Sequence, residues 1–306
     1  MSRPDLSKLR RVQIEDYALL SSHLSRYQTP RSAYNIVNLM IWGTQFKAQW
    51  MEFAGRLIIF NETWMCVLMP LGMYFPPDEL IEISEAFCES KKCGTISLID
   101  NEYMALYRDS FTNFEITKDY TTADYIYLTE KLASLRGKKL QKKKNLISQF
   151  RKRYGDYEVT PLQKEASEEC FDFADQWYKD HPEDKDEGYQ YERGSLQKAF
   201  EYFELLKLAG LIIRHNRKMI AFTIYSQQSD DMVNVHFEKF DREMKGAAQL
   251  INWETAKHLQ DRYLYVNREE DMGVPGLRKS KRSYQPLMVL DSYRIKKNKP
   301  KEKKDQ

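Results

Sequence analysis

The chain has 306 residues, of which 42% are hydrophobic and 30% charged, and its formal net charge is +3. This composition is that of a globular protein with two domains or one large one, and because the charge is almost balanced, any basic surface has to be local. The four cysteines fit neither a disulfide framework nor a zinc site, and the apolar stretches are too short to cross a bilayer, so we expect a cytoplasmic protein without a metal site.

The first half of the chain is predicted to hold helices around a strand meander. Apolar positions within residues 33–49 fall on a helical stripe, and two apolar runs at 50–60 and 64–70 flank a short polar turn, which predicts strands. Pro77 followed by Asp78 predicts a helix that continues to about Cys88. Residues 95–99 then predict a buried strand.

The middle of the chain carries a concentrated basic segment. After a strand at 124–128 and a short helix, nine Lys or Arg and no acidic residue occur between Arg136 and Arg153. Apolar residues still recur on one face, so we expect a docked helix over 136–154 with a basic outer face. The basic face is either ordinary solvated surface or a contact surface for the phosphates of tRNA or of anionic lipid headgroups. In the second case the contacts come from Lys138, Lys139, Lys142 and Lys143.

The second half repeats the order of the first. Helices are predicted at 165–179 and 195–208 around a polar loop at 181–188. Strands at 211–214, 219–225 and 232–237, a helix at 246–259 and a strand at 263–266 follow. The polar run 296–306 is predicted to be a disordered basic tail.

This recurring order predicts a duplicated α/β unit, and it resembles the Gcn5-related N-acetyltransferase (GNAT) fold in tandem. We therefore expect an α/β (α+β) fold with two GNAT-like units, each a mixed, mostly antiparallel sheet flanked by helices. Residues 1–123 are predicted to form a degenerate first unit. Residues 124–295 are predicted to form the second unit, which includes the basic helix and the active site.

Three segments sharpen the resemblance: residues 125–145, with a Tyr-Ile-Tyr strand and a Lys-rich run, residues 245–254, and residues 267–281. Together they resemble the phosphatidylglycerol lysyltransferase C-terminal-like family, whose members fuse two GNAT-like units and are similar to the Fem peptidyltransferases. The resemblance covers roughly residues 27–293. It implies transfer of an aminoacyl group from aminoacyl-tRNA to an amine or hydroxyl acceptor that is lipid or peptide-like.

Residues 267–286 are the best candidate site, because they are strongly charged and follow a predicted strand, where ligands of α/β proteins gather. Asp271 is predicted to hold an amine, and Arg278 to bind a carboxylate or phosphate. Asn267 and Lys281 are predicted to add substrate contacts. The structural alternative is a salt bridge between Asp271 and Arg278.

Acyl transfer also needs a polarised carbonyl and a route for protons. The polarising donor is expected to be a backbone N–H near Phe237 or Glu238. Strand alternation places His236 and Glu238 on one face with Phe237 opposite. We expect Glu238 to act with Asp271 in catalysis, His236 to bind substrate, and Tyr284 to serve as an acid. The sequence contains no serine, cysteine, zinc-protease, Walker or dinucleotide motif that supports another reaction.

A donor phosphate has one further candidate site, at the start of the helix predicted at 246–259. Its residues are Arg242, Lys245, Gly246, Ala247 and Ala248, although they equally suit a tightly packed helix start. Glu243 occupies a position where a GNAT unit has Gln or Arg, which favours aminoacyl-tRNA over acyl-coenzyme A as donor. The alternatives are an acyl-coenzyme A-dependent N-acyltransferase and a non-catalytic module that binds RNA or another anionic ligand. Peripheral contact with an anionic membrane is a further expectation.

Overall fold

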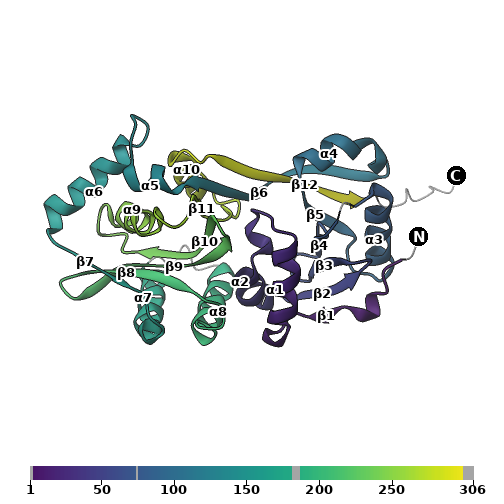
Figure 1. Cartoon of the computed structure of the whole chain (residues 1–306), viewed down its shortest axis with the longest axis horizontal. Coiled ribbons are helices and arrows are strands. Elements are labelled where there is room, and N and C mark those ends of the chain that lie inside the picture. The colour runs from purple at the N-terminus through teal and green to yellow at the C-terminus, as the bar shows by residue number, and fades with distance from the viewer. Residues whose placement is uncertain (1–2, 74, 181–186, 299–306) are drawn as a thin grey trace. The chain divides into compact units, whose positions relative to one another are not determined.

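The structure is a computed structural model that describes residues 3–73, 75–180 and 187–298 (Figure 1). The chain divides into two compact units: unit 1 contains residues 1–27, 46–123 and 291–306, and unit 2 contains residues 28–45 and 124–290. One of the boundaries between the units falls between residues 123 and 124. Residues 28–45 and 291–295, however, lie in the opposite unit from the one that the sequence predicts, because a reading in chain order cannot see that a unit is assembled from separate segments.

Unit 1 is built on a sheet with the strand order β1-β2-β3-β4-β5-β12-β6. The bounds of the strands are β1 Arg10–Arg11, β2 Ala48–Phe53, β3 Arg56–Asn61, β4 Cys66–Leu68, β5 Thr95–Ile99, β12 Met288–Lys297 and β6 Phe114–Leu128. Its helices are α1 (Tyr17–Arg26), α3 (Pro77–Glu89) and α4 (Asn101–Tyr107). Helix α3 begins where the sequence predicts, with proline and two acidic residues in its first turn.

Unit 2 is built on the strand order β6-β11-β10-β9-β8-β7. The bounds of the strands are β11 Tyr265–Asn267, β10 Met232–Phe240, β9 Lys218–Ser229, β8 Ala209–His215 and β7 Glu158–Pro161. Helix α9 (Ala247–Leu259) contacts α5 (Thr129–Ser134) and α6 (Gln141–Tyr154) on one face. Helices α7 (Ser167–Asp180) and α8 (Glu187–Glu201) lie on the other face, and α2 (Ile36–Gln45) contacts α8 (Figure 1).

The two units repeat one pattern of strands. In unit 1 the antiparallel strands β2, β3 and β4 are followed by α3 and by β5, which runs parallel to β4. In unit 2 the antiparallel strands β8, β9 and β10 are followed by α9 and by β11, which runs parallel to β10. The expected mixed, mostly antiparallel sheets flanked by helices are therefore confirmed.

Some local predictions were wrong. The helix predicted at 195–208 runs over Glu187–Glu201 instead, and the strand predicted at 124–128 is only the end of β6. The polar segment after β11 contains a helix, α10 (Pro275–Ser283), which was not predicted because the segment is so strongly charged. Most of the loop predicted at 181–188 and the tail predicted at 296–306 lie outside the described residues. Within the part of the chain that is described, no helix is long and apolar enough to cross a membrane.

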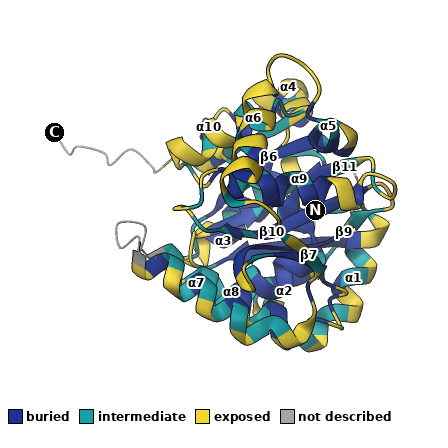
Figure 2. Ribbon diagram, turned by 90° about the vertical axis from the view of Figure 1, so that its left-hand side faces the viewer, coloured by how far each residue is buried: buried dark blue, intermediate teal, exposed yellow. Residues whose placement is uncertain are grey.

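Each unit has its own hydrophobic core. In unit 1 the core lies between the sheet and α3, with Phe60, Leu80 and Phe87 among its fully buried members. In unit 2 the core lies under α9, where Leu250 and Ile251 face the strands. Figure 2 shows the buried residues on the strands and the exposed residues on the outer faces of the helices.

Candidate functional site

The candidate site in unit 2 lies where two parallel strands diverge. The ladder between β10 and β11 ends at the pair Asn234 and Asn267, whereas β10 continues to Phe240. A β-bulge interrupts β10 between Val235 and Phe237. Bulges redirect side chains and occur often beside active sites. Beyond Asn234, β10 therefore stays paired with β9 but has no pairing with β11 on its other edge.

The bulge overturns the predicted alternation at this point. His236 bonds to Asn38 of α2, and the ring of Phe237 stacks on Trp42 of the same helix with a centroid separation of 5.6 Å. Glu238 instead pairs with Arg268. The prediction that His236 and Glu238 share a face was wrong, because the extra residue in the bulge lets two consecutive side chains point toward α2.

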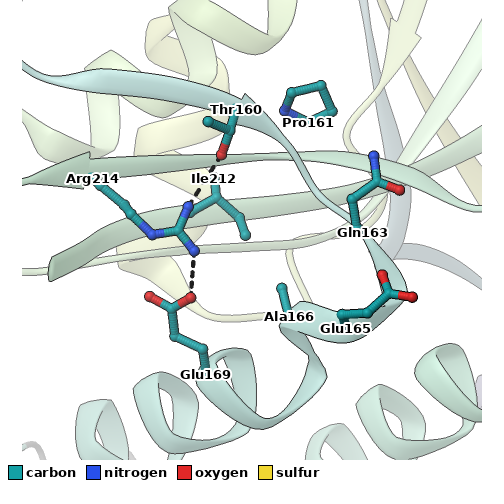
Figure 3. A pocket seen from close by; sticks show the side chains of 8 residues that line it. All are labelled: Thr160, Pro161, Gln163, Glu165, Ala166, Glu169, Ile212 and Arg214. Carbon is teal, nitrogen blue, oxygen red and sulfur yellow. Dashed lines mark hydrogen bonds and ion pairs between the residues drawn. The ribbon is translucent and has the colours of Figure 1, made fainter. Parts of the chain in front are cut away.

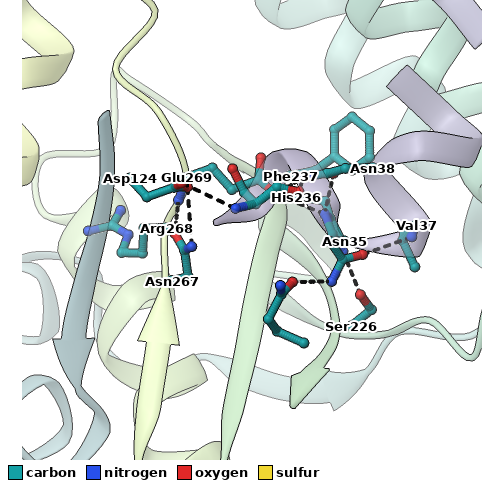
Figure 4. Close-up of polar contacts among 12 residues, drawn as sticks. Asn35, Val37, Asn38, Asp124, Ser226, His236, Phe237, Asn267, Arg268 and Glu269 are labelled. Carbon is teal, nitrogen blue, oxygen red and sulfur yellow. Dashed lines mark hydrogen bonds and ion pairs between the residues drawn. The ribbon is translucent and has the colours of Figure 1, made fainter. Parts of the chain in front are cut away.

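A hydrogen-bonded chain crosses the α2 side of the sheet (Figure 4). The Nε2 atom of His236 lies 2.7 Å from the Ser226 hydroxyl, and its Nδ1 atom lies 2.8 Å from Asn38 Oδ1 and 2.9 Å from Glu269 Oε1. Both partners of Nδ1 are acceptors, so Nδ1 carries a proton. Asn38 also donates to Glu269 over 2.8 Å. Glu269 is thus held in place although its backbone is left-handed, with φ of 57°.

Asn267 sits beside this chain and fixes a buried carboxylate. Its side-chain amide donates to Asp124 Oδ1 over 3.2 Å and to the carbonyl of Pro30 over 2.8 Å. Burial raises the pKa of Asp124 to about 6. The neighbouring Asn234 is completely buried, and neither polar atom of its side chain has a hydrogen-bond partner within the described structure. Asn267 therefore contacts the protein itself, and its expected substrate contact stays a prediction.

Arg268 occupies the opposite, α9 side, and sequence reasoning missed it. Its guanidinium donates to Glu238 over 2.8 Å and lies 5.9 Å from the ring centroid of Tyr127 and 5.1 Å from that of Tyr284. It lies inside the charged segment after β11, but only its contacts in the fold show which side of the sheet it takes.

Asp271 and Arg278 bind each other. The guanidinium of Arg278 donates to both carboxylate oxygens, over 2.7 and 2.9 Å, while Tyr125 and the backbone of Gly273 donate to the same group. Asp271 is completely buried. Burial alone would raise its pKa, but the hydrogen bonds from Arg278 and Tyr125 outweigh that effect and hold the pKa below its ordinary value. The structural alternative, a salt bridge, is thus present, and the two separate ligand roles remain unsupported.

Lys281 of α10 and Tyr284, which directly follows that helix, are both buried. The ammonium of Lys281 donates to the backbone carbonyls of Arg268, Glu269 and Glu270, over 2.5 to 3.1 Å, so it holds the loop after β11 in shape. Burial lowers the pKa of Lys281 to about 8. Tyr284 is buried, and burial raises its pKa well above the ordinary value.

The proposed donor-phosphate residues start α9 against a neighbouring helix. Gly246 has φ of 101°, and a Cβ atom on it would lie 2.6 Å from the backbone oxygen of Leu146 in α6. Ala247 is buried, whereas Arg242 and Lys245 are exposed. Helix α6 thus packs against the start of α9, which agrees with the alternative of a tightly packed helix start.

The four lysines expected on the basic face differ in their exposure to solvent. Lys138, Lys139 and Lys142 are exposed. Lys143 is partly buried, with its ammonium 4.2 Å from the ring centroid of Tyr284, and burial lowers its pKa to about 8. Lys143 therefore belongs to the surroundings of Arg268 and Tyr284, and the other three form solvent-facing charge.

A separate pocket of about 350 Å³ lies beside the edge strand β7 (Figure 3). Arg214 in its wall bonds to Glu169 and to Thr160. None of the residues predicted for substrate or donor lines it. Among the described residues no cluster of His, Cys, Asp and Glu is arranged to hold a metal ion.

The chain is similar to known proteins over nearly its whole length. Residues 25–296 match the family described as "Phosphatidylglycerol lysyltransferase, C-terminal". A conserved protein of unknown function from Bacteroides thetaiotaomicron VPI-5482 is 32% identical, with a TM-score of 0.85, and the match covers 97% of this chain and 100% of that one.

Two further solved structures share the fold at low identity. L-PGS from Bacillus licheniformis is 16% identical, with a TM-score of 0.60 and coverage of 92% of each chain. FemX is 8% identical, with a TM-score of 0.54 and coverage of 94% of this chain and 96% of that one. These likenesses extend over nearly the whole chain, so both units are included.

Proposed function

This chain belongs to the phosphatidylglycerol lysyltransferase C-terminal family, and from that membership we propose that it transfers an aminoacyl group from aminoacyl-tRNA to an amine or hydroxyl acceptor. The observation that supports a site in this chain is the divergence of β10 from β11, with charged side chains directed to both sides of it. Such an arrangement suits a reaction in which charge develops on a carbonyl oxygen.

Arg268 is the residue that we assign to the developing negative charge. Its guanidinium is largely enclosed, because its side chain is only 11% exposed, and it lies beside two tyrosine rings and one carboxylate. A cation held in such a low-dielectric setting stabilises an oxyanion more strongly than one in water. The backbone N–H groups near Phe237 and Glu238, beside the bulge, are the proposed second donors.

The proposed reaction is a displacement at the ester carbonyl of the aminoacyl-tRNA. The acceptor nitrogen or oxygen attacks the ester carbonyl, and the acceptor loses its proton to Glu238 as the tetrahedral intermediate forms. The ester C–O bond then breaks, and the departing ribose oxygen of the tRNA takes a proton from Tyr284. Because burial raises the pKa of Tyr284, its ionised form is unfavourable, and the proton that Glu238 took returns to Tyr284 as the product leaves, which restores both groups.

Two observations favour a tRNA donor over acyl-coenzyme A. The start of α9, where a GNAT unit would bind a pyrophosphate, is covered by α6 at Gly246. The same helix α6 is basic, and three of its expected phosphate-contacting lysines lie at or just before its start and are exposed.

A transfer assay tests the function. The purified chain is incubated with radiolabelled charged tRNAs and, in separate reactions, phosphatidylglycerol vesicles or amine-bearing peptides. We expect label to move from tRNA to one acceptor class, and Arg268→Met to lower kcat/KM at least about 100-fold. The matched control is Arg217→Gln, which alters an exposed arginine in the β8–β9 turn. Absence of transfer to every acceptor, with a folded protein, would contradict the proposal.

Binding of tRNA is tested separately. Reversing the charges of Lys138, Lys139 and Lys142 to Glu should weaken tRNA binding and reduce the slope of log affinity against log salt by roughly 0.7 to 0.9 for each lost phosphate contact. Lys218→Glu, at the exposed start of β9 in unit 2, is the control. An unchanged affinity and slope in the triple variant would exclude α6 as the tRNA surface.

A further inference from the structure

Strand β7 is the last strand of the sheet in unit 2, so one of its two edges has no partner strand among the described residues. Its other edge pairs with β8, from Glu158 opposite Arg214 to Pro161 opposite Leu211. The residues of β7 are exposed or only partly buried. A strand edge of this kind presents main-chain groups with which another chain can pair.

The direction of these main-chain groups follows from the register between β7 and β8. The N–H of Leu162 donates to the carbonyl of Gly210 over 2.9 Å, directly beyond the last pair of the ladder. Hydrogen-bonded pairs alternate along an antiparallel ladder, so Thr160 bonds to β8, whereas Val159 and Pro161 direct their main-chain groups away from it. The free edge of β7 therefore offers the N–H and carbonyl of Val159 and the carbonyl of Pro161.

The proline stands where it does not disturb the sheet. Pro161 has no N–H, and at this position of the ladder an N–H would point to the free edge. It removes one donor from that edge and leaves the groups of Val159 available. Because prolines limit pairing at sheet edges, this edge suits a short added segment and not a long strand.

The α7 face of β7 carries the pocket of about 350 Å³ described above (Figure 3). Thr160 and Ile212 line it from the strands, and Glu165 and Glu169 line it from the opposite side. The guanidinium of Arg214 bonds to Glu169 and Thr160. The exposed Glu165 has no ion pair or side-chain hydrogen bond within the described part of the chain. The pocket therefore has a carboxylate whose charge is not compensated.

The α9 face of β7 carries a second pocket, of about 280 Å³. Val159, Pro161 and Leu211 form its apolar wall, and Lys257 and His258 of α9 line it as well. Val159 packs against the core cluster that contains Leu211. Successive residues of a strand point to opposite faces, so a chain paired with β7 would direct successive side chains into the two pockets in turn.

We propose that the free edge of β7 binds an extended segment of a partner protein as an added strand, with a basic side chain beside Glu165 and an aliphatic side chain beside Val159. The main-chain groups of the edge supply hydrogen bonds, and the two pockets select the side chains. The proposal is independent of the transfer reaction, since none of these residues belongs to the site beside β11.

The charges argue against a second copy of this chain as the occupant. Alternation places Glu158 on the same face of β7 as Thr160. Pairing of two β7 strands would therefore bring the carboxylate of Glu158 toward that of Glu165, where a cation is needed, and like charges facing each other across strands are unfavourable. A different chain with Lys or Arg at this place meets the requirement.

Selection from a peptide library tests the proposal with the full chain. Random linear peptides displayed on yeast are selected for binding to the wild type and counter-selected against Val159→Pro, which removes the outward N–H. We expect the enriched sequences to alternate aliphatic residues with Lys or Arg. A synthetic copy of one should bind the wild type at least about tenfold more tightly than Val159→Pro. The control Val159→Thr keeps the N–H and a branched side chain, and should bind the peptide as the wild type does.

The charge preference is tested with a matched pair of variants. Glu165→Lys and Glu168→Lys change two exposed glutamates by the same charge, but only Glu165 lines the pocket. We expect Glu165→Lys to weaken binding of the selected peptide about fivefold. It should also strengthen binding of the same peptide with Glu in place of its basic residue. Glu168→Lys should leave both affinities unchanged.

Three outcomes would overturn the proposal. No peptide enriched on the wild type loses binding to a folded Val159→Pro variant, or Glu165→Lys and Glu168→Lys change the affinity equally. Alternatively, size-exclusion chromatography shows that the wild type is a dimer and that Val159→Pro is a monomer, which would assign the edge to a second copy of the chain.

Discussion

Three consecutive residues at the end of β11 illustrate how much depends on single positions. Asn267 and Glu269 bond toward Asp124 and His236, while Arg268 between them pairs with Glu238 on the other side of the sheet. One short segment thus takes part in two polar networks, one on each side of the sheet.

Asp124 carries a prediction about pH. Its folded-state pKa of about 6 lies above the ordinary value of 3.8, so the folded state holds a proton that the unfolded state has lost between about pH 4 and 6. The free energy of unfolding therefore falls as pH rises through this window, and the whole of this decrease is present above pH 6. From pH 5 to 7.5 the wild type should lose about 1 kcal/mol that Asp124→Asn does not lose.

Urea unfolding at the two pH values measures this difference. Asp261→Asn, which changes an exposed carboxylate in the same unit, should keep the slope of the wild type. If Asp124→Asn also keeps that slope, then Asp124 is ionised in the folded protein and its burial is compensated by its hydrogen bonds.

At the scale of elements, the contact between α6 and α9 decides how the basic helix is held. Gly246 is the point of closest approach, because a side chain there would meet the backbone of Leu146 and the Cβ atom of Phe150. The buried Ile147 and Phe150 complete the docking face of α6, which leaves its lysines and arginines outward. The basic surface and the covered start of α9 are thus two results of one packing contact.

Gly246→Ala should destabilise the fold by about 2 to 4 kcal/mol, since alanine is strained at φ of 101° and its Cβ would clash with a backbone oxygen. Gly276→Ala is the matched control. Gly276 lies in α10, and nothing lies within 4 Å of its Cβ position, so this change should stabilise slightly, by up to about 1 kcal/mol. Thermal and urea unfolding of both variants distinguish them, and equal stabilities would contradict the packing argument.

At the scale of the whole molecule, unit 2 is discontinuous in sequence. Residues 28–45 belong to it, and they supply Asn38 to His236 and Ser32 to Asp124. Their main helix, α2, also covers Phe237 with Trp42. The candidate site therefore cannot be completed by the chain after residue 124 alone.

A fragment of residues 124–290 should accordingly lack a cooperative unfolding transition. Joining residues 28–45 to this fragment through a flexible Gly-Ser linker of about 20 residues should restore the transition, because the missing polar and apolar partners return. Circular dichroism during urea unfolding measures both. A cooperative transition in the shorter fragment would show that residues 28–45 are dispensable for folding.

Local sequence patterns were enough to predict most helices and strands and their repetition. Local signals such as Pro77 with its acidic first turn, or the apolar run at 95–99, act over a few residues and are readable without any partner. The charged segment after β11 was also identifiable, because so many charges cannot enter a core. Its helix α10 was not predicted, since the buried residue of that helix is Lys281 and no simple apolar stripe marks it.

Which of these residues contact one another depends on the fold. The bulge at His236 places His236 and Glu238 on different faces, although a regular strand would place them on one. Asp271 and Arg278, which were predicted to bind different ligands, form a salt bridge with each other. The contacts of His236 with Asn38 and of Glu238 with Arg268 join residues 198 and 30 positions apart. Hydrogen bonds and ion pairs act over a few ångströms in space, whereas sequence patterns report only neighbours along the chain, so the partners in the site had to come from the fold.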